Sequence, residues 1–107
     1  MLKEQALAQA RQLIQKNRVF LFMKGSPNFP QCGFSGRAVD LLRQAGAEFS
    51  HFDILSDPDM RAAVKVLGAW PTFPQLYVDG ELVGGSDIIS EMAASGELAP
   101  LLQHKAL

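Results

Sequence analysis

A chain of 107 residues with 48% hydrophobic residues can bury a core without disulfides or structural metals, and we expect one domain over residues 1–107. The net charge of −1, with scattered lysines and arginines, lacks the electrostatic footprint of a nucleic-acid-binding protein. No apolar run approaches the roughly 20 residues that span a bilayer, and the first residues lack the apolar block of a signal peptide. With a single cysteine and no possible disulfide framework, these features predict a cytoplasmic protein with no membrane or nucleic-acid partner.

The first half of the chain predicts a helix, a strand and a second helix. Residues 2–16 place apolar side chains at the spacing of an amphipathic helix. Residues 18–25 form a continuous run of β-favouring apolar residues, which indicates a buried central strand. The segment SPNFPQ (26–31) holds two prolines, so we expect no regular structure there. Residues 33–45 return to helical spacing, with Gly46 as the expected C-cap.

The middle of the chain predicts a second strand and a third helix. Residues 48–54 alternate between apolar and polar side chains, as a half-buried strand would. Asp57 followed by Pro58 predicts a helix start, with Asp57 as N-cap and proline at the first helical position. The helical spacing continues to residue 67 and ends at a glycine.

The last third predicts a β-hairpin and two short helices. Residues 75–85 read as two strands joined by Asp79-Gly80, which is a strong hairpin signal. Helices are expected over 87–95 and 97–104. The resulting order, α-β-α-β-α-β-β-α-α, predicts an α/β fold of thioredoxin-like layout, in which helices cover both faces of a mixed four-stranded sheet in three α/β/α layers.

The single cysteine, Cys32, falls at the predicted N-terminus of helix 33–45. Unpaired backbone N–H groups and the positive end of the helix dipole favour a thiolate there, and Lys24 at the end of the preceding strand adds a nearby cation. Such settings lower a cysteine pKa from about 8.5 to about 3.5–7.5. A small buried residue is the alternative role for a lone cysteine, but the polar loop before it favours a nucleophile or metal ligand.

Residues 70–74 hold two prolines directly before a strand, which indicates a special turn. A cis Phe73–Pro74 bond would leave the Phe73 backbone available to pair with an extended peptide. A plain rigid turn explains the prolines equally well.

The segment GGSDI (84–88) has glycines before a helix start, where a ligand can approach the backbone and first-turn N–H groups can hold a carboxylate. Asp87 could instead accept an ammonium group. Ser86 or Asp87 acting only as an N-cap is the simpler alternative. On the third helix, Arg61 and Lys65 lie one turn apart on one face, either solvated or engaging a second carboxylate.

Two segments, MKGSPNFPQCGFSGRAVDLL and WPTFPQLYVDGELVGGSDII, resemble the monothiol glutaredoxins of the CGFS type. The resemblance extends from about residue 15 to residue 102 and implies a glutaredoxin fold with a glutathione site. It implies that the glutathione thiol lies beside Cys32, while the cysteinyl backbone pairs with Phe73 ahead of a cis Pro74. It also implies that the glycine carboxylate meets Lys24 and Arg61.

The same resemblance implies that the γ-glutamyl end of glutathione meets the backbone of Ser86 and the side chain of Asp87, with Trp70 flanking the site. The family often has a cysteine at the position of Ser86, so one potential disulfide partner of Cys32 is absent here. The residues that the resemblance assigns to cofactor binding are Lys24, Gly33, Phe34, Arg61, Trp70, Thr72, Phe73, Pro74, Gly85, Ser86 and Asp87.

Ligand counting separates the functions that a single thiol can support. A 2Fe–2S cluster needs four ligands, which two Cys32 thiolates and two glutathiones supply in a cluster-bound homodimer. The resemblance implies that such a carrier pairs with BolA-like proteins and delivers clusters to apo iron–sulfur proteins. In this reading Cys32 is both the reactive residue and the metal ligand.

The alternative is a glutathione-dependent monothiol oxidoreductase that removes glutathione from proteins through a mixed disulfide on Cys32. Ser35 occupies the CxxC position, so an intramolecular disulfide is excluded, and this activity is generally weak in the CGFS family. A non-catalytic adaptor is a third possibility, disfavoured because the glutathione-site residues occur together. His51 and His104 receive no role, because neither has a partner at a ligand spacing.

Overall fold

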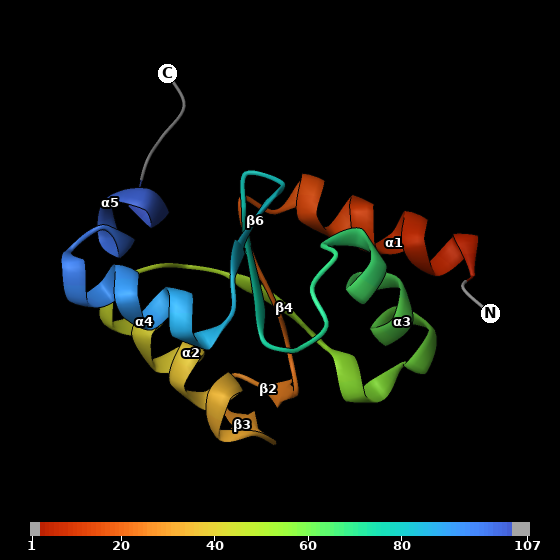
Figure 1. Ribbon diagram of the computed structural model, residues 1–107, viewed down its shortest axis with the longest axis horizontal. Helices are drawn as coiled ribbons and strands as arrows, with labels where there is room; N and C mark the ends of the chain where they lie inside the picture. Colours follow the sequence, from red (N-terminus) through yellow and green to blue (C-terminus); the bar gives the residue numbers. More distant parts are fainter. Residues whose placement is uncertain (1–2, 104–107) are drawn as a thin grey trace.

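A mixed sheet of four strands lies between two layers of helices in the computed structural model, which describes residues 3–103 of the chain (Figure 1). In chain order the elements are α1 Glu4–Lys16, β1 Val19–Met23, β2 Gly25–Ser26, β3 Phe29–Pro30, α2 Gly33–Gln44, β4 Ser50–Asp53, the 3-10 helix η1 Ile54–Ser56, α3 Pro58–Leu67, β5 Gln75–Val78, β6 Glu81–Gly84, α4 Ser86–Ser95 and α5 Leu98–Gln103.

The sheet has the strand order β4-β1-β5-β6. Strand β1 runs parallel to β4, to which α2 connects it, and antiparallel to β5, which pairs with β6 as a hairpin. Asp79 and Gly80 form the hairpin turn with φ of 53° and 80°, as the Asp-Gly signal predicts. The predicted α/β/α fold with a mixed four-stranded sheet is therefore confirmed.

Strand β1 supplies side chains to both faces of the sheet. Because successive strand residues point to opposite faces, Phe20 and Phe22 enter one core while Val19, Leu21 and Met23 enter the other. All five are buried, so the continuous apolar run predicted the central strand correctly.

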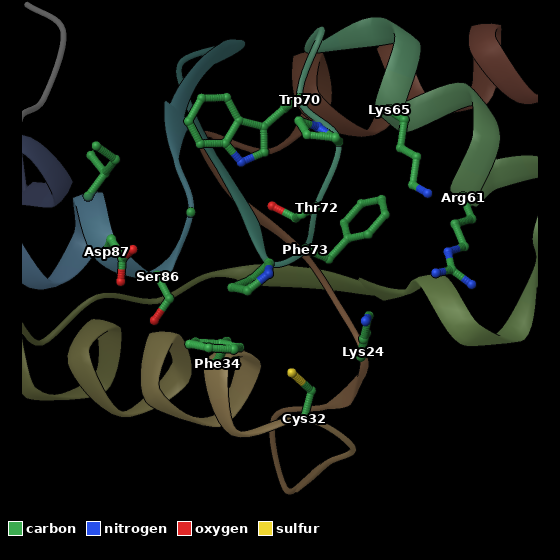
Figure 2. A pocket seen from close by; sticks show the side chains of 14 residues that line it. Lys24, Cys32, Phe34, Arg61, Lys65, Trp70, Thr72, Phe73, Ser86 and Asp87 are labelled. Atoms are coloured by element: carbon green, nitrogen blue, oxygen red, sulfur yellow. The ribbon is translucent and has the colours of Figure 1, made fainter.

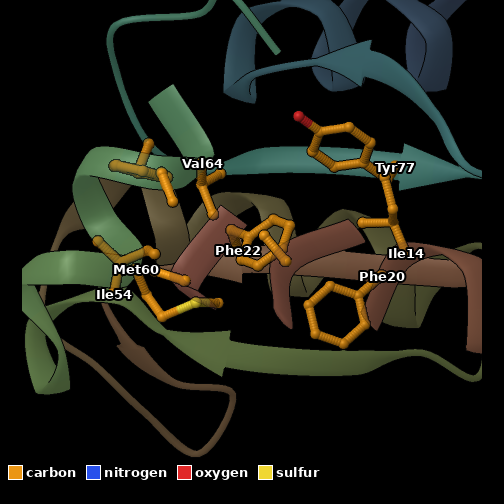
Figure 3. Close-up of a cluster of buried hydrophobic side chains, with 11 residues drawn as sticks. Ile14, Phe20, Phe22, Ile54, Met60, Val64 and Tyr77 are labelled. Atoms are coloured by element: carbon orange, nitrogen blue, oxygen red, sulfur yellow. The ribbon is translucent and has the colours of Figure 1, made fainter. Parts of the chain in front are cut away.

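The first core lies under α1 and α3, as Figure 3 shows for the side chains around Phe22. The Phe22 ring meets the Tyr77 ring edge-on at a centroid distance of 5.6 Å, a geometry that aromatic pairs favour. The second core lies under α2, α4 and α5, where Leu42, Ile89 and Leu98 are at most 2% exposed. Helices thus cover both faces of the sheet (Figure 1).

The predicted start of α3 is confirmed. The Asp57 carboxylate accepts hydrogen bonds from the N–H groups of Asp59 (3.0 Å) and Met60 (3.1 Å), and Pro58 opens the helix. The end of α2 differs by one residue from the expected position. Ala45 is the C-cap, and Gly46 follows it in the left-handed region at φ 75°.

The prediction that SPNFPQ has no regular structure is wrong. The two-residue strands β2 and β3 pair antiparallel, Gly25 with Pro30 and Ser26 with Phe29. A two-residue ladder at the molecular edge tolerates Pro30, because proline lacks only the donor that a central strand needs. At the end of this hairpin opposite its turn, the Gln31 N–H donates a hydrogen bond to the Lys24 carbonyl at 2.9 Å.

The remaining differences are at element ends. The strand predicted over 48–54 is limited to Ser50–Asp53. It ends at Asp53 because the Asp53 side chain accepts a hydrogen bond from the Leu55 N–H as the chain turns into η1. The ends of the helices predicted over 2–16 and 97–104 include residues 2 and His104, which lie outside the described residues.

Arg18 ties the C-terminal helix to the sheet. Its guanidinium donates to the carbonyls of Leu101, at 2.8 Å, and Leu102, and it forms an ion pair with Asp79 at 3.2 Å. Carbonyls at a helix C-terminus lack intrahelical donors, so one side chain holds α5 and the β5–β6 turn together. Among residues 3–103, no helix is both long and apolar enough to cross a bilayer.

Candidate functional site

A pocket of about 460 Å³ opens beside the C-terminal end of β1 and the N-terminus of α2 (Figure 2). Every site residue predicted from the sequence lines this pocket except Gly33, which is the first residue of α2. Lys65, Pro71 and Ile88 also line it. The pocket walls are Lys24, Cys32, Phe34, Arg61, Lys65, Trp70, Pro71, Thr72, Phe73, Pro74, Gly85, Ser86, Asp87 and Ile88.

Cys32 is the N-cap residue of α2, and its backbone is extended at φ −154°. The pKa of its thiol is lowered, first by the backbone N–H of Ser35 and then by the Phe34 N–H, the Lys24 charge and the Ser35 hydroxyl; partial burial opposes them. The predicted combination of helix N-terminus and Lys24 therefore acts on this thiol. Cys32 itself is partly exposed, and Phe34 two residues later is 63% exposed, so the thiol lies at the rim of the pocket.

The backbone at Lys24 is held by side chains from two other elements. Its N–H donates to Ser35 Oγ of α2 at 3.1 Å, and the next N–H, that of Gly25, donates to Asp53 Oδ1 of β4 at 2.9 Å. Ser35 is fully buried. These two bonds fix the point where the chain leaves β1, and they set the position from which the Lys24 side chain enters the pocket.

Charges of opposite sign occupy the two ends of the pocket. Figure 2 shows Arg61 and Lys65 on the α3 side of Phe73, Lys24 below Phe73 near Cys32, and Asp87 at the opposite end of the pocket. Within residues 3–103 the three cations form no ion pair. The pocket is therefore suited to an elongated ligand with an anion at one end and a cation at the other.

The N-terminus of α4 forms the acidic end. Its N-cap is Gly85, with no side-chain cap, so the simpler alternative of Ser86 or Asp87 as N-cap is wrong. The first-turn N–H groups are thus not used by a capping side chain. A Cβ on Gly85 would lie 3.3 Å from the Pro74 carbonyl oxygen and 3.4 Å from Trp70 Nε1, so glycine permits this close packing.

The loop between α3 and β5 forms the wall opposite Cys32. The Phe73–Pro74 bond is cis, as one of the two sequence-based interpretations requires. Among residues 3–103, neither the N–H nor the C=O of Phe73 makes a hydrogen bond. The Phe73 backbone is therefore open to pairing with an extended peptide.

The sequence did not predict the structural roles of three polar residues behind the pocket. Ser35 and Asp53 accept hydrogen bonds from the backbone at Lys24 and Gly25, and the third residue is Gln75. The fully buried Gln75 donates from Nε2 to the carbonyls of Trp70 (3.0 Å) and Thr72 (3.2 Å). The one available signal was a glutamine at the first position of a strand that is otherwise apolar. Within residues 3–103 no group of three or more His, Cys, Asp or Glu side chains could hold a metal ion.

A cysteine at the N-terminus of α2 lies at the same end of a mixed α/β/α sheet as a cis-proline loop, an arrangement typical of a thioredoxin-like protein. Residues 19–83 match the family model described as Glutaredoxin. The chain is 57% identical over 83 residues to the probable monothiol glutaredoxin GrlA of Legionella pneumophila, covering 78% of this chain and 93% of that protein. The chain belongs to the glutaredoxin family, among its monothiol members.

Two further comparisons agree. A monothiol glutaredoxin of rice (Oryza sativa subsp. japonica) is 58% identical over 93 residues, which are 87% of this chain but only 19% of that longer protein. A buckwheat glutaredoxin, solved in complex with glutathione, superposes with a TM-score of 0.81 at 28% identity and covers 92% of this chain and 88% of its own. The resemblance seen in the sequence is confirmed.

Proposed function

We propose that this monothiol glutaredoxin binds glutathione in the pocket and, as a homodimer, carries a 2Fe–2S cluster to apo iron–sulfur proteins. The observation that carries the proposal is the backbone of Phe73, which has no hydrogen-bond partner within residues 3–103 and lies between a cationic and an acidic end, opposite Cys32. Glutathione matches this pattern, because it is a short peptide with a carboxylate at its glycine end and both an ammonium group and a carboxylate at its γ-glutamyl end.

The proposed binding mode assigns one part of the tripeptide to each part of the pocket. Lys24 and Arg61 hold the glycine carboxylate, and the Phe73 backbone pairs with the cysteinyl residue. At the other end, Ser86 at the first turn of α4 donates its N–H to the γ-glutamyl carboxylate, and Asp87 accepts the ammonium group. A buckwheat relative solved in complex with glutathione supports glutathione as the ligand.

In this proposal the 2Fe–2S cluster is the cargo of the protein, and the available thiolate ligands fit such a cluster. Iron–sulfur clusters are held by thiolates, and the lowered pKa of Cys32 favours the thiolate that such a ligand requires. One cysteine per chain leaves three of four ligand positions to other molecules. Two glutathione thiolates and the Cys32 of a second subunit complete the set. We place this carrier in the cytoplasm, with BolA-like proteins as further partners.

A second candidate function rests on the same lowered pKa. The Cys32 thiolate would attack the glutathione sulfur of a protein–glutathione disulfide and release the client thiolate. A second glutathione thiolate would then attack the Cys32–glutathione disulfide, leave as oxidised glutathione and restore the Cys32 thiolate. No second cysteine exists to accelerate this release, so we rank the oxidoreductase below the carrier.

Reconstitution of the full chain with iron, sulfide and glutathione tests the carrier. We expect visible cluster absorption together with a shift to dimer in size-exclusion chromatography. Both should be lost in Cys32→Ser and without glutathione. A cluster that survives Cys32→Ser unchanged, or that forms equally well without glutathione, would contradict the proposal. Rapid turnover of a glutathionylated peptide by a protein that forms no cluster would favour the oxidoreductase.

A further inference from the structure

The loop from Gly68 to Pro74 is attached to the rest of the protein unevenly. At its start, the N–H groups of Ala69 and Trp70 donate to carbonyls at the end of α3, each at 3.1 Å. From Pro71 to Pro74, no backbone group bonds to another backbone group among residues 3–103. Within this segment the Thr72 carbonyl accepts a hydrogen bond from the Gln75 amide, which also donates to the Trp70 carbonyl directly before it.

Gln75 is buried in a manner that packing alone does not explain. An amide placed in a core costs free energy unless its polar atoms are paired. Here the amide donates to two loop carbonyls, and Gln75 Oε1 accepts a hydrogen bond from Tyr77 Oη at 3.1 Å. Burial raises the pKa of Tyr77 to about 12, so its hydroxyl remains a donor at neutral pH.

Little room remains around this chain of hydrogen bonds. A Cβ on Gly68 would lie 2.5 Å from Tyr77 Oη and 3.2 Å from Gln75 Oε1, so the turn after α3 approaches closely because it lacks a side chain. The hydrogen bonds of Gln75 and Tyr77 are therefore covered on one side by the loop that begins at Gly68.

The bond to Thr72 sets the direction of the Phe73 N–H. In a trans peptide the C=O and N–H of one plane point in opposite directions, and the Thr72–Phe73 bond is trans because Phe73–Pro74 is the cis bond of the described chain. Gln75 holds the Thr72 carbonyl from the core side. The Phe73 N–H in the same plane must therefore point away from the core, toward the pocket.

We infer that Gln75 is a positioning residue for ligand binding, which orients the Phe73 N–H by holding the Trp70 and Thr72 carbonyls. The inference rests on the proposed glutathione site. Phe73, 6% exposed, fixes where the loop lies, but apolar packing has no direction and does not by itself orient the Thr72–Phe73 peptide plane. Loss of the Gln75 amide should therefore reduce the affinity for the ligand more than a substitution elsewhere that lowers the unfolding free energy equally.

Two variants and one control separate positioning from stability. Gln75→Leu removes the amide. Gln75→Glu keeps the size and the acceptor for Tyr77 but places a carboxylate oxygen against the two loop carbonyls. Leu98→Ala, in α5 within the other core, is the matched destabilised control.

In the ligand-free protein, ¹⁵N order parameters of Trp70, Thr72 and Phe73 report on the loop. The Trp70 indole N–H, buried and without a partner within residues 3–103, is a further probe. We expect order parameters of about 0.85 in wild type and in Leu98→Ala, and below about 0.6 in both Gln75 variants. Unchanged order parameters in the Gln75 variants would overturn the inference.

Calorimetric titration measures the affinity for two ligands. One is glutathione, and the other is an analogue in which an (E)-alkene replaces the cysteinyl–glycine amide. The analogue lacks the carbonyl that would accept from Phe73. Wild type should bind glutathione about tenfold more tightly than the analogue, and Gln75→Leu should lose most of this ratio.

The outcomes distinguish the two hypotheses. If wild type does not bind glutathione, the proposed function fails and the inference fails with it. If wild type binds and discriminates, but both Gln75 variants retain the same affinity and ratio, only the inference fails. Weaker binding in the Gln75 variants, with Leu98→Ala unchanged, supports both.

Discussion

The Ser35 hydroxyl accepts a hydrogen bond of 3.1 Å from the backbone N–H of Lys24. A dithiol protein would carry its second cysteine at this position. Here the serine is fully buried and links the end of β1 to α2. Its hydroxyl and its backbone N–H also lower the pKa of Cys32. The residue that excludes an internal disulfide therefore also places the neighbouring cation and favours the thiolate.

Replacing Ser35 by alanine should raise the pKa of Cys32 partway toward its ordinary value. The backbone N–H of residue 35, the largest cause of the lowering, survives the change, while the hydroxyl is lost. The Lys24 N–H also loses its acceptor, which should cost about 1–3 kcal/mol of unfolding free energy. Thiolate absorbance against pH measures the first effect, and urea unfolding measures the second. An unchanged pKa would contradict the role given to the hydroxyl.

The lowered pKa of Cys32 predicts how stability depends on pH. An acid whose pKa is lower in the folded than in the unfolded state stabilises the fold fully above the unfolded-state pKa. This contribution declines as the pH falls and disappears below the folded-state pKa. The unfolding free energy of wild type minus that of Cys32→Ser should therefore rise with pH between these two values. A difference that stays flat or falls with rising pH would refute the prediction.

Asp53 should matter for its acceptor atom and little for its charge. Its Oδ1 accepts from the N–H groups of Gly25 and Leu55, each at 2.9 Å. Asp53→Ala leaves both donors without this partner and should cost about 1–2 kcal/mol in urea unfolding. Asp53→Asn retains an oxygen and should remain within about 0.5 kcal/mol of wild type. Equal losses in the two variants would mean that the carboxylate charge dominates.

Gly25 and Gly96 form a matched pair for testing backbone strain against steric contact. Both have left-handed backbones, with φ of 88° and 82°. A Cβ at Gly25 would lie 2.5 Å from the Phe29 carbonyl oxygen, whereas no atom lies within 4 Å of one at Gly96. Gly96→Ala should cost about 1 kcal/mol, and Gly25→Ala should cost at least about 1 kcal/mol more. Similar unfolding free energies would rule out the contact at Gly25.

Much of the fold could be predicted because its signals are local. The apolar run of β1, the Asp57-Pro58 start of α3 and the Asp79-Gly80 turn each express a rule that acts within a few neighbouring residues. Strands β2 and β3 were missed because two residues are too few to show a periodicity. Their pairing depends instead on the return of the chain at Gln31 to Lys24.

The candidate site was predictable where a side chain itself carries the chemistry. Cys32, Lys24 and Asp87 stand out by residue type, and all three line one pocket, although their roles remain predictions. Ser35 and Gln75 were not predictable in this way. Each acts on a backbone group elsewhere in the chain, at Lys24 or in the loop at Trp70 and Thr72. Which backbone groups lack a partner becomes visible only in the folded structure.

Strand β1 joins the two cores by sending alternate residues into each. Neither helical layer can melt alone without exposing one face of this shared strand, so we expect the layers to unfold as one cooperative unit. The pocket takes α2 and α4 from one layer and Arg61 of α3 from the other. A partly unfolded chain would therefore not retain half a binding site, and ligand affinity should report on the population of the fully folded protein.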